Sequence, residues 1–355
     1  MRIGIIGTGT MGTGIAQSAA LAGCEVVLHD REAQAARAAV GRIGASLAKA
    51  VAGGKLELAQ AEAASARLSI SADLAAFAGA DMVIEAVAEI EAVKRALFEV
   101  LAPQLRPDAV IATNTSSLSV SELARGMVGE ERFVGLHYFF PAHVNPLLEV
   151  VEGAASSPQA VETALAFARL TGKQPLRCRD VYGFAVNRFF VPYLNESIRL
   201  MDEGHQPAAI DHAARSAFGT KAGPFKVMDL SKVEIALHAC RTLERLGPFY
   251  TPAAGLVAKV EAGGNWDAPD LAEPGPNEAE IARRLQSAVF VAVLDELDQQ
   301  VAAPADIDMG ARLGLQWQWQ PVSAMKALSA EKVRDMIAPL LVRAGKAEPK
   351  SLGEF

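Results

Sequence analysis

A glycine-rich turn near the start of the 355-residue chain has residue types and a spacing that can hold a phosphate group. It fits the pattern G-x-G-x-x-G and consists of Gly7, Thr8, Gly9, Thr10, Met11 and Gly12. An apolar run typical of a strand precedes it, and an amphipathic segment, Gly14–Ala22, follows. In that setting Gly7 makes the tight turn, Gly9 leaves room for a pyrophosphate, and Gly12 lets the helix pack closely on the strand. The amides of the helix N-terminus would then bind a dinucleotide.

An acidic residue, Asp30, ends the second apolar run, 18 residues after Gly12. A carboxylate at this place accepts hydrogen bonds from the adenosine ribose and repels a 2′-phosphate. Arg31 works against this discrimination, because a neighbouring arginine can accommodate that phosphate. The pattern favours NAD over NADP as the cofactor.

Polar residues follow two further apolar runs, at Thr113–Ser117 and at His137. At the carboxyl ends of parallel strands, such side chains line the ligand crevice. A histidine there could take up and return a proton at neutral pH, since its pKa is about 6.5. Most histidines at strand ends are structural. The other five histidines lack polar partners of this kind, and His143 is the nearest rival.

These residues must be positioned by a sheet, which six apolar runs in the first 180 residues predict. The runs are Ile3–Ile6, Val26–Leu28, Met82–Ile84, Ala109–Ala112, Phe133–Leu136 and Leu147–Val151. Alanine-rich segments at 31–52, 90–102 and 158–171 predict helices between them, so we expect a Rossmann-like, doubly wound parallel sheet covered on both faces. Residues 31–66 exceed a simple crossover, and their Gly53-Gly54 break predicts a projecting helical hairpin.

After Asp180 the pattern is helical throughout. Residues 266–277 hold three prolines and three acids, which is typical of a linker. On either side of it, residues 207–224 and 304–321 align without gaps at an offset of 97. We interpret this as a duplicated helical unit; chance similarity in an alanine-rich sequence is the alternative. The predicted domains are 1–180 (cofactor binding), 181–265 (helical copy 1) and 278–355 (helical copy 2).

The composition argues against several classes of partner. The formal net charge of −7 leaves no broad basic face for nucleic acid, and no apolar run is long enough to span a membrane. The three cysteines show no metal-ligand or C-x-x-C spacing, so we predict no metal site and buried thiols in a reducing compartment. The first strand begins at Arg2, which leaves no room for a targeting peptide, and we expect a cytoplasmic enzyme.

Several segments, in their order and spacing, resemble the 3-hydroxyacyl-CoA dehydrogenase family over nearly the whole chain. They are Asp81–Glu89, Ala112–Ser119, Gly135–Pro141, Leu147–Glu149 and Asp180–Arg188. The resemblance implies NAD-dependent oxidation of the 3-hydroxyl of an acyl-CoA thioester. It implies that His137 moves the proton and that Glu149, twelve residues later, holds its tautomer and stabilises the imidazolium. Ser116 and Asn187 would hydrogen-bond the substrate oxygen.

The resemblance also implies ligand-binding residues. Glu89, Lys94 and Asn114 would lie along the nicotinamide half of the cofactor. Ser46 and Lys55, on the projecting hairpin, would meet the CoA moiety.

One position departs from the family pattern, and the duplication adds a second difference. Phe140 stands where the family commonly has asparagine or another small polar residue, a change expected to lower cofactor affinity or shift substrate preference. The second helical copy places Arg283 opposite Asn187, so it cannot rebuild an active site. We expect it to pack on copy 1 as a dimer partner would, giving a monomeric pseudo-dimer; an ordinary homodimer is the alternative.

Two other functions stay open: a non-catalytic NAD-binding relic, and a dehydrogenase of a small hydroxy acid without CoA. The intact His137, Glu149, Ser116 and Asn187 argue against the relic. The N-T-S-S segment and the 31–66 hairpin favour a CoA thioester. The chain contains no hydratase segment, so we expect it to perform only the redox step.

Overall fold

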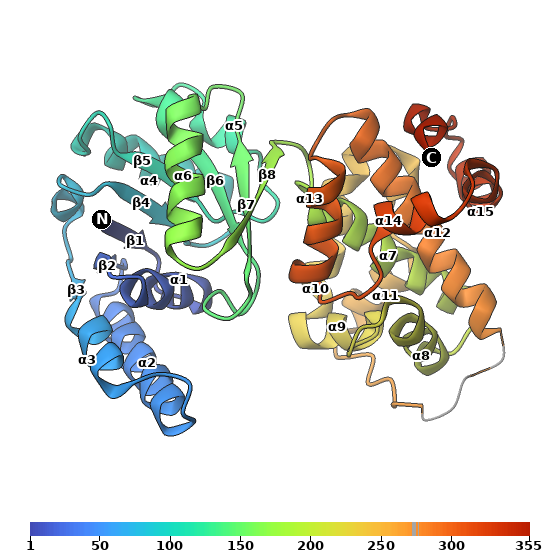
Figure 1. Cartoon of the computed structure of the whole chain (residues 1–355), viewed down its shortest axis with the longest axis horizontal. Helices are drawn as coiled ribbons and strands as arrows, with labels where there is room; N and C mark the ends of the chain where they lie inside the picture. Colours follow the sequence, from blue (N-terminus) through green and yellow to red (C-terminus); the bar gives the residue numbers. More distant parts are fainter. Residues whose placement is uncertain (272–274, 276) are drawn as a thin grey trace. The chain divides into compact units, whose positions relative to one another are not determined.

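The alternation of apolar strands and alanine-rich helices in the first half of the chain builds an eight-stranded sheet (Figure 1). The computed structural model describes residues 1–271, 275 and 277–355, and it divides into the units Met1–Asp180 and Val181–Phe355. Within the first unit the strand order is β3-β2-β1-β4-β5-β6-β7-β8. The strands are β1 Arg2–Ile6, β2 Glu25–His29, β3 Leu68–Ile70, β4 Met82–Glu85, β5 Val110–Thr113, β6 Phe133–Tyr138, β7 Leu147–Glu152 and β8 Gln174–Arg179.

The helices of the first unit cover this sheet as the alternating pattern predicts. They are α1 Thr10–Leu21, α2 Ala33–Ala52, α3 Leu58–Ala66, α4 Glu91–Leu101, α5 Val120–Ala124 and α6 Pro158–Leu170. Buried side chains of α1 and α6 form one apolar cluster with one face of the strands. The predicted hairpin is α2 and α3, which extend together away from the sheet (Figure 1). The Rossmann-like fold is therefore confirmed.

The sheet is not parallel throughout, which corrects the prediction. β1 to β6 run parallel where they pair, whereas β7 runs antiparallel to β6 and β8 runs parallel to β7. Only residues 139–146, without a helix, connect β6 to β7. A parallel return needs a crossover of about a dozen residues or more, so this short connection forces the strand to reverse.

Two strands were missed in the sequence for physical reasons. β3 has three residues, none of them buried, and therefore shows no apolar run. In β8 buried and exposed positions alternate, and its outward residues are polar, as on a sheet edge.

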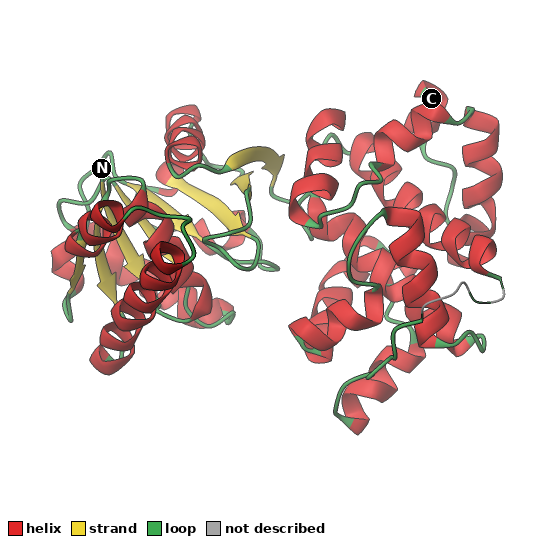
Figure 2. Ribbon diagram, turned by 60° about the horizontal axis from the view of Figure 1, so that its bottom comes forward, coloured by secondary structure: helices red, strands yellow, loops and turns green. Residues whose placement is uncertain are grey.

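The second unit consists of helices among its described residues, and Figure 2 draws strands only in the first unit. The helices are α7 Val186–Asp202, α8 Pro207–Phe218, α9 Pro224–Ser231, α10 Val233–Leu243, α11 Ala254–Ala262, α12 Glu278–Asp298, α13 Pro304–Met309, α14 Pro321–Ala327 and α15 Ala330–Ala344. None of the described helices combines the length and apolar character needed to cross a bilayer. Of the predicted linker, 272–274 and 276 lie outside the described residues, and 266–271 form no helix or strand.

Two equivalent capping contacts recur in this unit. Asp211 accepts hydrogen bonds from the amides of Phe225 (2.8 Å) and Lys226 (3.1 Å) at the start of α9. Asp308 accepts them from the amides of Val322 (2.8 Å) and Ser323 (3.0 Å) at the start of α14. Each residue of the second set lies 97 positions after its counterpart, the offset found in the sequence.

Candidate active site

His137 and Glu149 form a buried pair across β6 and β7. The two residues are direct partners in the antiparallel register, so their side chains project from the same face of the sheet. The imidazole Nδ1 lies 2.5 Å from the Glu149 Oε2, and the residues are 6% and 0% exposed. A carboxylate oxygen accepts a hydrogen bond from a protonated Nδ1, and in that tautomer Nε2 is the nitrogen that can exchange a proton. The Phe139 ring packs against the imidazole, and the centroids of the two rings are 4.7 Å apart.

The loop after β5 lies beside this pair, because β5 and β6 are neighbours in the sheet. The Asn114 side chain accepts a hydrogen bond from the amide of Tyr138 (3.0 Å), the residue after His137. Ser116 is exposed on the same loop, and its amide donates to Glu89 at 3.0 Å. The structure thus brings Asn114 and Ser116 to the edge of the sheet at which β6 delivers His137.

Two carboxylates and one ammonium form a cluster beneath that loop. The Nζ of Lys94, which is 1% exposed, lies 2.7 and 2.9 Å from the two oxygens of Glu85 and 3.1 Å from Glu89. Glu89 also accepts a hydrogen bond from the Thr115 hydroxyl (2.5 Å). Burial raises the pKa of Glu89, but Lys94 and the hydrogen bonds outweigh it and leave the pKa below its usual value. Glu89 is therefore ionised and fixes the loop that carries Ser116.

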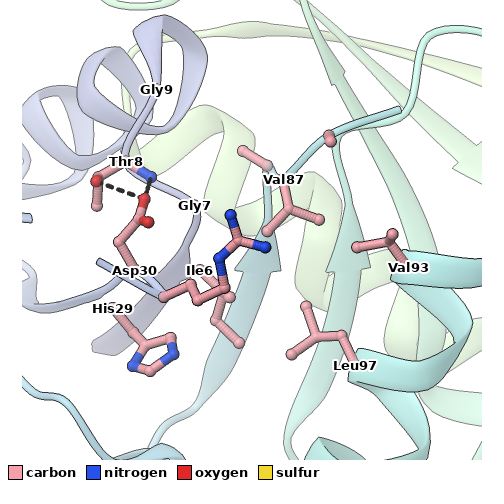
Figure 3. Close-up of a pocket in the computed structure, with 12 residues that line it drawn as sticks. Ile6, Gly7, Thr8, Gly9, His29, Asp30, Val87, Val93 and Leu97 are labelled. Carbon is pink, nitrogen blue, oxygen red and sulfur yellow. Dashed lines mark hydrogen bonds between the residues drawn. The ribbon is translucent and has the colours of Figure 1, made fainter. Parts of the chain in front are cut away.

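The glycine turn and Asp30 line a cavity of about 400 Å³ (Figure 3). Asp30 accepts hydrogen bonds from the amide (2.8 Å) and hydroxyl (2.7 Å) of Thr8. Burial raises the pKa of Asp30, yet these bonds lower it more, and the net shift is downward. Val87 and Leu97 supply an apolar wall. Arg31 lines the cavity beside Asp30, so the lining carries one charge of each sign. A cavity of this volume has a size and chemistry suited to part of a dinucleotide.

The close approaches expected at the glycines are present. A β-carbon on Gly12 would lie 1.9 Å from the carbonyl oxygen of Gly7, whereas one on Gly9 would meet nothing within 4 Å. Gly7 has φ +93°, which favours glycine. Thr10 and Met11 form the first turn of α1, where amides not used within the helix can bind a pyrophosphate.

The remaining predicted residues lie on other elements of the fold. Ser46 is half-buried on α2, and Lys55 is exposed in the turn between α2 and α3. Asn187 is half-buried near the start of α7, in the second unit. Phe140, the departure from the family pattern, is 69% exposed two residues after β6.

Sequence reasoning assigned no role to Glu85 or Thr8. Glu85 is fully buried and accepts hydrogen bonds from Lys94, the amide of Val87 (2.6 Å) and the hydroxyl of Thr113 (2.7 Å). An acid at the end of an apolar run was the available signal. Thr8 lies between two motif glycines, where the pattern accepts any residue.

Comparisons with known proteins agree with this architecture. Residues 2–181 match the NAD binding domain of 3-hydroxyacyl-CoA dehydrogenase, and residues 183–265 match the C-terminal domain of the same enzyme. The chain is 35% identical over 266 residues to the probable 3-hydroxybutyryl-CoA dehydrogenase of Deinococcus radiodurans, covering 74% of this chain and 95% of that protein.

Two Escherichia coli K12 proteins are also similar. The 3-hydroxyadipyl-CoA dehydrogenase is 42% identical over 229 residues, which cover 64% of this chain and 48% of that protein, so the aligned part spans about half of its length. The crystal structure of a 3-hydroxybutyryl-CoA dehydrogenase superimposes with a TM-score of 0.91 at 26% identity, covering 100% of this chain and 98% of that chain. The chain therefore belongs to the 3-hydroxyacyl-CoA dehydrogenase family, and its cofactor is NAD.

Proposed function

We propose that the chain oxidises (S)-3-hydroxyacyl-CoA to 3-ketoacyl-CoA reversibly, with His137 as the group that moves the proton. The observation that carries this proposal is the buried His137–Glu149 pair at 2.5 Å. A buried imidazole held by a carboxylate is suited to taking and returning one proton. The relatives described above are dehydrogenases of hydroxyacyl-CoA compounds, which supports the substrate class.

The proposed roles follow from the chemistry of each side chain. Bound NAD supplies the acceptor for the hydride from C3. His137 takes the hydroxyl proton at Nε2, while Glu149 keeps the other proton on Nδ1 and stabilises the imidazolium charge. Ser116 and Asn187 hydrogen-bond the substrate oxygen and hold C3 in position. In the reverse direction the imidazolium returns the proton to the carbonyl oxygen.

The proposed binding residues fall into two groups. Those for the cofactor are Gly7, Gly9, Thr10, Met11, Gly12, Asp30, Glu89, Lys94 and Asn114. Those for the CoA moiety are Ser46 and Lys55 on the α2–α3 hairpin. We also propose the cytoplasm as the location, since Cys24, Cys178 and Cys240 are buried thiols, as is usual in a reducing compartment.

Acetoacetyl-CoA should support NADH oxidation, whereas free acetoacetate at the same concentration should not. The reason is that the binding energy of the CoA moiety helps to hold C3 of the acyl group in position for the reaction. The measurement is the loss of NADH absorbance, with NADPH as a cofactor control. Turnover of acetoacetate as fast as of its CoA ester would favour a small hydroxy acid. Tight NADH binding without turnover of either would favour a non-catalytic relic.

We further propose three domains, 1–180, 181–265 and 278–355, the last two being copies that pair within one chain. The repeated caps at Asp211 and Asp308 support the duplication. The copies pack through α7 and α12. Between them Glu196, 1% exposed on α7, lies 2.6 Å from Arg284 on α12 and 2.5 Å from Arg343 on α15. A buried acid that meets two arginines of the other copy resembles the contacts of a dimer interface.

Sedimentation equilibrium should give the mass of one chain across a wide range of concentrations. The reason is that copy 2 already occupies the α7 face on which a second subunit would pack. Arg284→Glu, which places a third acid beside Glu196 and Glu203, should lower the melting temperature without changing the mass. A mass of two chains, with α7 protected from hydrogen exchange only in the dimer, would rule out the pseudo-dimer.

A further inference from the structure

Lys173 is a buried lysine at the entrance to β8, directly before Gln174. Its side chain is directed at the connection between β6 and β7, residues 139–146, which we call the β6–β7 loop. The Nζ donates hydrogen bonds to the carbonyl oxygens of Ala142 (2.6 Å) and Asn145 (2.7 Å). The residue is 5% exposed, so water does not replace these contacts easily.

The burial of this ammonium is costly and is not offset by an opposite charge. Burial alone lowers the pKa of Lys173 to about 8, with no carboxylate among the described residues acting against it. Lysine is rarely buried unless it is paired, because its charge loses hydration. An apolar side chain would fill the space at a lower cost. What Lys173 provides instead is two hydrogen bonds to backbone carbonyls of the loop, those of the buried residues Ala142 and Asn145.

The β6–β7 loop adjoins the catalytic pair and lies against the cofactor helix α1. It leaves β6 two residues after His137 and enters β7 two residues before Glu149. It also lies against α1: a β-carbon on Gly14 would be 3.0 Å from the Ala142 Cβ and 3.3 Å from the amide of the next residue. A shift of this loop would therefore disturb both the catalytic pair and the first turns of the cofactor helix.

We propose that Lys173 is a positioning residue that holds the β6–β7 loop against α1 and thereby fixes the His137–Glu149 pair and the cofactor helix. The hydrogen bonds act at two points, one at each half of the loop. A third hydrogen bond, from the amide of Gln174 to the carbonyl of Pro146 (2.7 Å), fixes the end of the loop. The carbonyl of Ala142, in the first half of the loop, is bound by Lys173. The role of His137 in this statement rests on the proposed function.

The test compares Lys173→Met, which keeps length but has no donor, with Lys173→Gln, which keeps an amide donor. Lys326→Met, at an exposed position on α14 in the second unit, is the matched control. In Lys173→Met, amide hydrogen exchange in residues 142–147 should speed up by about tenfold or more. The dissociation constant of NADH should rise, and kcat should fall, each by about tenfold. Lys173→Gln should lie between Lys173→Met and the wild type in all three.

Two results would overturn the proposal. One is loop exchange in Lys173→Met equal to that in Lys326→Met; the other is faster exchange with unchanged kcat and NADH affinity. If Lys173→Met does not fold, Lys173→Gln decides by the same comparison with the control. Hydrogen exchange and NADH binding can be measured without turnover. A wild-type chain without dehydrogenase activity would therefore refute the proposed function, while these two measurements would still test the role of Lys173.

Discussion

Replacing His137 with glutamine is expected to lower kcat by about 10²–10⁴-fold. The amide occupies a similar volume but cannot accept the hydroxyl proton at the position of Nε2. The dissociation constant of NADH should change little, because the glycine turn and Asp30 lie on other elements. Stopped-flow reduction of acetoacetyl-CoA and fluorescence titration with NADH measure the two quantities separately.

His143→Gln is the discriminating control for this substitution. His143 lies on the β6–β7 loop, where burial and then the charge of Lys173 lower its pKa. It is the nearest rival of His137 in the sequence. Its replacement should leave kcat within about threefold of the wild type. A large loss in His143→Gln together with near-normal turnover in His137→Gln would transfer the catalytic role.

Replacing Glu149 with glutamine should lower kcat by about 10²–10⁴-fold. The amide preserves the shape of the Glu149 side chain, which is 0% exposed. It carries no charge that could stabilise the imidazolium. The steady-state rate with saturating acetoacetyl-CoA and NADH is the measurement, and circular dichroism checks the fold.

A double substitution makes this prediction sharper. If Glu149 acts only through the imidazole, the His137→Gln/Glu149→Gln chain should have the same kcat as His137→Gln alone. The reason is that removing the imidazole already removes the whole contribution of Glu149 to the rate. Multiplicative losses in the double variant would mean that Glu149 has a separate function and would contradict the assigned pair.

The sequence predicted the elements that have strong local patterns. The glycine turn, β1, α1 and the α2–α3 hairpin follow from residues close together in the chain, and the structure contains them. The 97-residue offset likewise predicted a relation that the equivalent caps at Asp211 and Asp308 support.

What escaped prediction depends on partners distant in sequence. The reversal of β7 follows from the short connection between Tyr138 and Leu147. The periodicity of apolar residues identifies a strand but does not indicate its direction. Glu85 and Lys173 look unremarkable in the sequence, and their importance lies in which backbone and side-chain groups the fold brings to them. Catalytic assignments came from a resemblance, since the residue types alone permitted His143 as well.

The opposed directions of β6 and β7 make the catalytic pair sensitive to how the two strands align. Side chains alternate between the faces of a sheet, so sliding β7 by one residue would carry the Glu149 carboxylate to the other side of the sheet. Misaligned chains could still bind cofactor through the first strands. A refolding experiment could then measure the recovered fraction of turnover and the recovered fraction of NADH-binding sites. The ratio of the first to the second would give the fraction of cofactor-binding molecules in which β6 and β7 pair in the correct register.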